Sequence, residues 1–166
     1  MGVVFIFLLL TPSIEGATLL EYQIKAAFIY NFLKFIDLPK VKENGTINVC
    51  IFGDDPFGKA IYLLEGKKVG NKTLHIKKID EVKKISGCQV VFFPASQKDK
   101  LKEALEFAKK KPILTIGEVP HFLDMGGVIN FVIIDGKIRF EINESIAREL
   151  GIKISSRLLR LARQVK

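Results

Sequence analysis

Apolar and polar residues follow two patterns that take turns along this chain, one typical of buried strands and the other of amphipathic helices. Near-continuous apolar runs at 46–52 and 89–94 predict strands buried in a parallel sheet, and further strands are predicted at 74–79 and 113–117. Helical spacing of apolar residues occurs at 19–36, 55–65, 97–110, 143–150 and from Ser155 or Ser156 onward, with shorter helical turns at 80–85 and 119–125. The sequence therefore predicts an α/β fold, a mostly parallel sheet flanked by helices on both faces, with a C-terminal antiparallel β-hairpin and terminal helix.

The hairpin is the most clearly specified element. Asp135-Gly136 separates two runs of alternating polarity, and this dipeptide favours a two-residue type I′ turn. Folding about the turn gives an apolar face directed at the core, with the pairs Ile133–Ile138, Phe131–Phe140 and Ile129–Ile142. The other face has the pairs Val132–Arg139, Asn130–Glu141 and Val128–Asn143. A slip of one residue would mix the two faces, so the register is predicted together with the hairpin.

The second face of the hairpin is a candidate partner-binding site, formed by Asn130, Arg139, Glu141 and Asn143. Mixed charged and apolar side chains suit a half-covered strand beside a protein interface, where arginine is enriched. The alternative is that a helix, such as the C-terminal one, covers this face and that Arg139 pairs with Glu141. Full burial of Arg139 and Glu141 would exclude the interface.

The N-terminus resembles a secretory signal. An unbroken apolar run, Val3–Leu10, is followed by Pro12-Ser13 and then by the small residues Gly16-Ala17. The run is too short to span a bilayer, and no Lys or Arg precedes it. We expect residues 1–17 to be a cleaved signal peptide and residues 18–166 to form a single domain. The alternative is a buried N-terminal strand.

The positive charge does not indicate nucleic-acid binding. The 166 residues carry 26 Lys and Arg against 18 Asp and Glu, a formal net charge of +8. Most of the basic residues are lysines scattered in short runs, whereas recognition of bases and phosphates favours the planar arginine fork. We therefore expect no nucleic-acid partner.

Few residues could carry catalysis. The two histidines, His75 and His121, belong to no HxxxH, CxxC or GxSxG pattern. The pair Asp54-Asp55 follows a strand at its carboxyl end, where α/β proteins bind ligands. Helix capping by Asp55, with Pro56 in the first turn, explains the pair without a ligand. We expect no enzyme activity, cofactor or metal site.

The two cysteines leave two alternatives open. An even number of cysteines in an exported chain suggests a disulfide, and Cys50 and Cys88 would then be partners. Against this, Cys50 is late in its predicted strand while Cys88 precedes its own, and a disulfide needs Cα atoms within about 7 Å. Two buried free thiols are the alternative.

Taken in succession, six segments resemble the YfiR family of small periplasmic proteins of Gram-negative bacteria. They are KAAFIYNFLKFIDLP (25–39), INVCIFGDDPFG (47–58), GCQVVFFPAS (87–96), ILTIGE (113–118), GGVINFVIIDGKIRFEIN (126–143) and GIKISSRLLRLAR (151–163). The resemblance implies that Cys50 and Cys88 form a structural disulfide. Some members carry a second cysteine pair before the hairpin, where this chain has VPHFLDMGG without cysteine.

The resemblance also implies a function. Similar proteins repress an inner-membrane diguanylate cyclase by binding its periplasmic part, which lowers cyclic-di-GMP and restrains biofilm formation, and an OmpA-like outer-membrane lipoprotein sequesters the repressor. The alternative from the residues is a periplasmic small-molecule-binding domain that uses the crevice near GDDPFG and PAS. An exposed apolar patch would favour the first function, and a deep pocket with convergent polar groups the second. A homodimer is left open.

Overall fold

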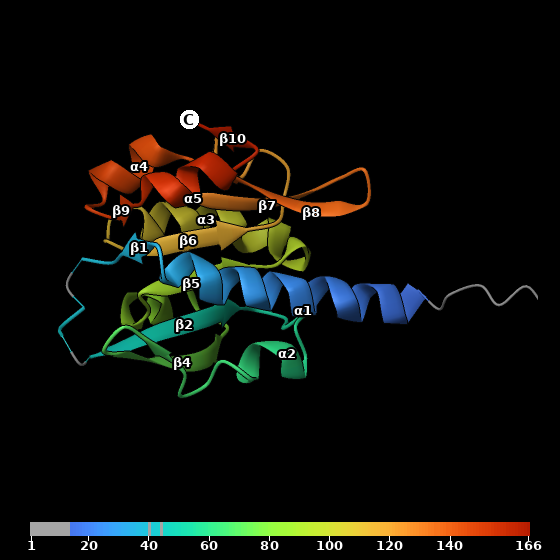
Figure 1. Cartoon of the computed structure of the whole chain (residues 1–166), viewed down its shortest axis with the longest axis horizontal. Coiled ribbons are helices and arrows are strands. Elements are labelled where there is room, and N and C mark those ends of the chain that lie inside the picture. Colours follow the sequence, from blue (N-terminus) through green and yellow to red (C-terminus); the bar gives the residue numbers. More distant parts are fainter. Residues whose placement is uncertain (1–13, 40, 44) are drawn as a thin grey trace, which may run out of the picture.

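A computed structural model describes residues 14–39, 41–43 and 45–166. Its main sheet has eight strands in the order β10-β8-β7-β6-β5-β2-β4-β3 (Figure 1). The strands are β2 (Thr46–Phe52), β3 (Lys68–Val69), β4 (Lys72–Ile79), β5 (Val90–Phe93), β6 (Leu114–Gly117), β7 (Ile129–Ile134), β8 (Lys137–Ile142) and β10 (Gln164–Val165). From β4 through β7 neighbouring strands are parallel, whereas β3 with β4 and β7 with β8 are antiparallel. The α/β fold class with a hairpin after the parallel strands is confirmed.

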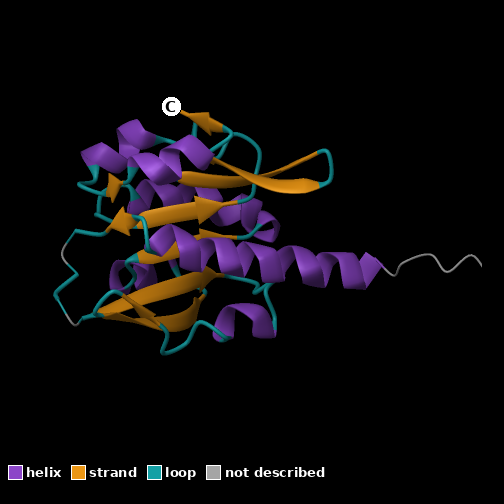
Figure 2. Cartoon of the chain, viewed as in Figure 1, coloured by secondary structure: helices purple, strands orange, loops and turns teal. Residues whose placement is uncertain are grey.

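Helices cover both faces of this sheet (Figure 2). The long helix α1 (Ile14–Leu33) and the short α2 (Lys59–Tyr62) pack on one face, and α3 (Lys98–Ala108) packs on the other with the 3-10 helix η1 (Val82–Gly87). The remaining elements are η2 (Ala95–Gln97), α4 (Glu144–Glu149), α5 (Ser156–Leu161) and a two-stranded sheet of β1 (Ile36–Asp37) and β9 (Lys153–Ile154). None of the described helices is both long and apolar enough to cross a membrane.

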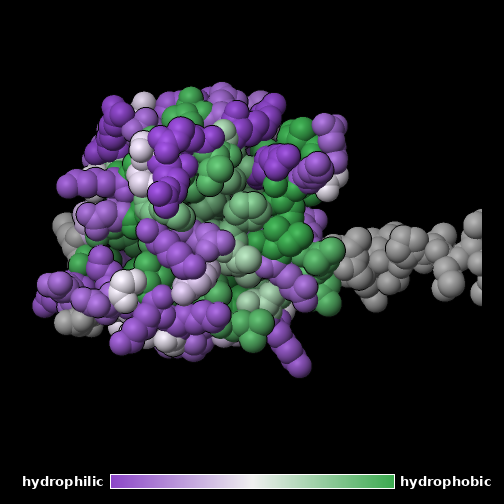
Figure 3. Space-filling model, viewed as in Figure 1, coloured by the Kyte–Doolittle hydropathy of each residue, from purple (hydrophilic) through white to green (hydrophobic). Residues whose placement is uncertain are grey.

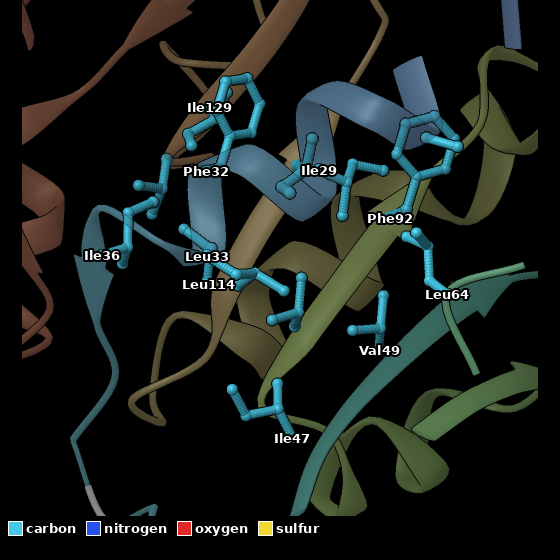
Figure 4. Packing of buried hydrophobic residues seen from close by; sticks show 14 of the residues in the cluster. Ile29, Phe32, Leu33, Ile36, Ile47, Val49, Leu64, Phe92, Leu114 and Ile129 are labelled. Atoms are coloured by element: carbon cyan, nitrogen blue, oxygen red, sulfur yellow. The ribbon is translucent and has the colours of Figure 1, made fainter. Parts of the chain in front are cut away.

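The sheet separates two hydrophobic cores, because successive strand residues point to opposite faces of the sheet. The larger core lies on the side covered by α1. Ile29, Phe32 and Leu33 of α1 lie over Phe92 and Ile129 of the central strands (Figure 4). Phe32 also contacts the rings of Phe131 and Phe140 on the hairpin. Packing against α1 therefore ties the hairpin to the parallel part of the sheet.

The disulfide lies in the second core, on the α3 side. Cys50 and Cys88 are bonded, with their Cα atoms 6.1 Å apart. Val90 pairs with Val49 at the start of β5, so Cys88 lies just before that strand. The chain leaving η1 brings Cys88 close enough to bridge, and the disulfide implied by the family resemblance is confirmed.

Three predicted helices differ from the structure. The first ends at Leu33 rather than at residue 36, because Ile36–Asp37 pair with β9. The helix predicted at 55–65 is reduced to α2: the Asp55 carboxylate accepts a hydrogen bond from the Phe57 amide, and Gly58, at φ +54°, precedes the helix. Residues 119–125 form turns.

The predicted terminal helix is also shorter than expected. Ser155 caps α5, which ends at Leu161, and Ala162 is extended. The chain then forms β10, parallel to the end of β8.

The predicted signal peptide, residues 1–17, lies mostly outside the described residues and stays a prediction. The described part of the chain begins with α1 at Ile14, within that segment.

Candidate interaction surface

At one end of the molecule, α1 and the hairpin both project beyond the sheet (Figure 1). Large apolar side chains are exposed there. We call this surface the end face. Its residues, with their exposed fractions, are Leu19 (54%), Leu20 (56%), Ile24 (39%), Tyr62 (44%), Leu63 (71%), Ile133 (55%) and Ile134 (37%). Figure 3 shows hydrophobic residues gathered over this end of the protein. Soluble proteins rarely leave contiguous apolar surface in water unless it binds something.

The end face contains two grooves that flank α1. The hairpin groove, about 600 Å³, lies between α1 and the hairpin and is lined by Leu20, Glu21, Ile24, Phe28, Ile133, Gly136, Lys137, Ile138 and Arg139. The α2 groove, about 510 Å³, lies on the other side of the helix and is lined by Leu19, Gln23, Ala26, Ala27, Lys59, Ala60, Leu63, Leu64 and Lys67. The N-terminal half of α1 is therefore a ridge between two apolar channels.

The hairpin groove exists because the hairpin extends beyond the neighbouring strands β6 and β10. Asp135 and Gly136 both have positive φ, 50° and 71°, as the predicted type I′ turn requires. The edge strand β10 pairs only with Glu141 and Ile142 of β8, so no strand of the described chain lies beside the tip.

The predicted hairpin register is confirmed, but not the burial of every pair on its core face. The pair Ile133–Ile138 forms as predicted. Ile133 is exposed and Ile138 is half-buried, because nothing in the described chain covers the tip.

A buried ionic cluster lies beside the end face, at the carboxyl ends of β5 and β6. The Lys25 ammonium is 2.6 Å from Glu118 Oε2, and their side chains are 4% and 5% exposed. Lys25 also pairs with Glu21. Glu118 Oε1 accepts hydrogen bonds from the Tyr22 hydroxyl at 2.9 Å and from the Ala95 amide at 3.0 Å. Burial, reinforced by the Glu118 charge, raises the pKa of the Tyr22 hydroxyl well above its ordinary value.

Sequence analysis missed this cluster. It borders a cavity of about 520 Å³ that also contacts Ala95 of the PAS segment, Asn130 and Phe131. The charges of Lys25 and Glu118 already satisfy each other. The available signal was the position of Glu118, a carboxylate directly after a buried parallel strand.

The four predicted partner-binding residues do not share one open face. Asn130 is 4% exposed and donates to the Val119 carbonyl. Asn143 is also buried, and it caps α4 by accepting from the Ile146 amide at 3.1 Å.

Arg139 and Glu141 differ from each other in exposure. The Glu141 side chain is 15% exposed and pairs with Arg163, not with Arg139. Arg139 is exposed and makes no ion pair within the described residues. Of the four, Arg139 alone borders the hairpin groove.

The other candidate residues have structural contacts. The Asp54 carboxylate accepts a hydrogen bond from the side-chain amide of Gln97 at 3.1 Å. His75 contacts Glu65, and His121 contacts Asp124. Within the described residues, no three His, Cys, Asp or Glu side chains are grouped so that they could hold a metal ion.

Comparison with known proteins gives a family and a fold. The family model described as YfiR/HmsC-like matches residues 22–163. A conserved domain protein from Vibrio cholerae O1 biovar El Tor has a similar structure, at 13% identity and a TM-score of 0.56, and an "ABC domain in complex with L-Trp" from Streptococcus pneumoniae aligns at 17% identity and 0.54. Each alignment covers 87% of this chain, and the chain spans 60% of the length of each solved one. At such low identities both matches show the fold alone. A search of curated proteins finds no significant match.

Proposed function

The chain belongs to the YfiR/HmsC-like family, and on that premise we propose that it is a non-enzymatic periplasmic regulator of cyclic-di-GMP signalling. In this proposal it binds the periplasmic part of an inner-membrane diguanylate cyclase and represses the enzyme, which lowers cyclic-di-GMP. An OmpA-like outer-membrane lipoprotein would sequester the protein and release the cyclase. A regulator of this kind needs a surface that captures a protein rather than a pocket that performs chemistry.

The end face is the observation that carries this proposal. It brings exposed leucine, isoleucine and tyrosine side chains from α1, from α2 with the residue that follows it, and from β7 to one end of the molecule. Apolar surface with a charged rim is typical of a protein-binding site. The rim here is basic, with Lys59 and Lys67 at the α2 groove and Lys137 and Arg139 at the hairpin groove.

The disulfide supports the proposed compartment. Disulfides form and persist in oxidising environments such as the bacterial periplasm, and they are rare in the cytosol. The Cys50–Cys88 bond is buried in the second core, where it acts as a structural crosslink.

The alternative function, small-molecule binding, has weaker support. The cavity near the PAS segment is the crevice this alternative requires, but its two buried charges, Lys25 and Glu118, are directed at each other. Ligand sites instead present polar groups that converge on the ligand. Among the described buried side chains, only the Asn130 Oδ1 atom lacks a hydrogen-bond partner, and Asn130 lines this cavity. The cavity therefore has one unpaired buried polar atom rather than a convergent set.

The test is capture from membranes combined with a measurement of cyclic-di-GMP in the native host. The full-length protein carrying an affinity tag is expected to bring down a diguanylate cyclase, and deletion of its gene is expected to raise cyclic-di-GMP. Periplasmic expression of the wild-type chain should reverse that rise. An unchanged cyclic-di-GMP level, with no cyclase captured, would reject the proposal.

A further inference from the structure

We propose that the hairpin groove receives an amphipathic helix of the partner protein, apolar on one side and acidic along the flank that faces the hairpin. This inference rests on the proposed function and deepens it, because it says where the cyclase is held and by what kind of segment. The argument uses the geometry of α1, the charge of the groove rim and the position of the hairpin.

The wall formed by α1 has the spacing that favours a second helix. Leu20, Ile24 and Phe28 line the groove at intervals of four residues and form one ridge along α1. Ridges at this spacing are the surfaces that pack into the grooves of a neighbouring helix. Leu20 and Ile24 are 56% and 39% exposed, whereas Phe28 is half-buried against Phe131 and Phe140. The groove is thus open toward the start of α1 and has a packed floor toward its middle.

The opposite wall is the uncovered part of the hairpin. Ile133 and Ile138 present apolar side chains to the groove, and Gly136 at the turn adds no side chain. A helix lying between α1 and this wall would bury the Ile133–Ile138 pair, which the alternating pattern directs to a core. The partner would therefore supply the cover that the described residues do not provide.

The rim selects an acidic flank. Lys137 and Arg139 stand on the hairpin side, and neither makes an ion pair within the described part of the chain. On the helix side Glu21 is already paired with Lys25. The unpaired charge at the groove is therefore positive and lies along one wall. Acidic residues on the corresponding flank of a bound helix would complement it and would also speed encounter with this basic protein.

The test uses the periplasmic domain of the cyclase captured from membranes and measures its dissociation constant with the full mature chain. Ile133→Asp and Arg139→Glu change the apolar wall and the rim, and Leu20→Asp repeats the apolar test on α1. All three positions are exposed, so the variants are expected to melt like the wild type. Each should weaken binding at least tenfold, and Arg139→Glu should also reduce the dependence of affinity on salt.

Two matched controls separate this site from a general loss of exposed apolar or basic groups. Leu161→Asp removes a leucine of α5 that is at least as exposed as Leu20, and Lys153→Glu reverses an exposed charge on β9. Neither residue lines the hairpin groove, and both controls should bind as the wild type does. A photo-crosslinker placed at Lys137 should attach to a helical segment of the cyclase that carries acidic residues.

The outcomes distinguish this inference from the proposed function. Tight binding by the wild type and equally tight binding by all three groove variants would overturn the hairpin groove and leave the proposed function standing. A wild-type chain that does not bind the cyclase would overturn both. If the groove variants lose binding only to phosphatidylglycerol vesicles and not to the cyclase, the groove binds lipid and the inference is wrong.

Discussion

Replacing Lys25 by methionine should destabilise the protein far more than the loss of a surface lysine. Methionine keeps most of the apolar stem but removes the charge, which leaves the Glu118 carboxylate, 5% exposed, without its counterion. Breaking a buried ion pair by removing one partner typically costs about 3–5 kcal/mol, because the other charge stays buried. We expect a loss near the lower end, about 3 kcal/mol, since Glu118 keeps its hydrogen bonds from Tyr22 and Ala95.

The double variant Lys25→Met/Glu118→Gln makes this prediction specific to charge. The glutamine carbonyl can still accept from Tyr22 and Ala95, and no unpaired charge is left at position 118. Its free energy of unfolding should return to within about 1 kcal/mol of the wild type. Urea unfolding followed by circular dichroism measures all three proteins. Lys84→Met, which removes exposed ion pairs with Asp80 and Glu81, is the control and should shift the midpoint little.

Two results would refute this reasoning. If Lys25→Met were as stable as the wild type, the burial of the pair would have no energetic consequence. If the double variant were as unstable as the single one, the loss would come from packing of the lysine stem. Either outcome would exclude an uncompensated charge at Glu118 as the cause.

Three further predictions address other parts of the molecule. Replacing Cys50 and Cys88 by alanine should lower the free energy of unfolding by about 4 kcal/mol, from the entropy of the closed loop, as measured by urea unfolding under oxidising conditions. Gly117→Ala should cost roughly 1–3 kcal/mol in the same assay, because its Cβ would lie 2.5 Å from the buried Phe122 ring, and wild-type stability would contradict this. Burial raises the pKa of the Tyr22 hydroxyl above its ordinary value of 10, so the stability contributed by Tyr22 is complete below pH 10 and is lost progressively at higher pH. The free energy of unfolding of Tyr22→Phe should therefore fall less than that of the wild type between pH 9 and 11.

The hairpin shows what local sequence can determine. Its turn and register follow from Asp135-Gly136 and from residues within ten positions of it, and both are confirmed. What covers each face depends on distant elements. Ile133 is therefore exposed although its alternation directs it to a core. The order of the strands in the sheet decides which part of the hairpin is covered by other elements. This order cannot be obtained from the alternation of polar and apolar residues alone.

The C-terminus and the ionic cluster illustrate the same limit. Helical spacing of apolar residues continues past Leu161. The backbone amides of Arg163 and Lys166 nevertheless donate hydrogen bonds to the carbonyls of Phe140 and Ile142, so pairing with β8 overrides the local preference for a helix. Lys25 and Glu118 are 93 residues apart, and no spacing rule connects them. The disulfide, by contrast, was correctly implied by the family resemblance, although residue spacing alone left it open.

The position of α1 has a consequence for the order in which the nascent chain can fold. This helix is synthesised before every strand, yet Phe32 is buried against Phe131 and Phe140. Its apolar side therefore cannot be fully buried until the hairpin has been made. Cys50 and Cys88, both made earlier than the hairpin, can meet before α1 has its full contact surface. A chain interrupted between the disulfide and the hairpin would carry an oxidised half-sheet and an open apolar helix, which is the kind of intermediate that aggregates.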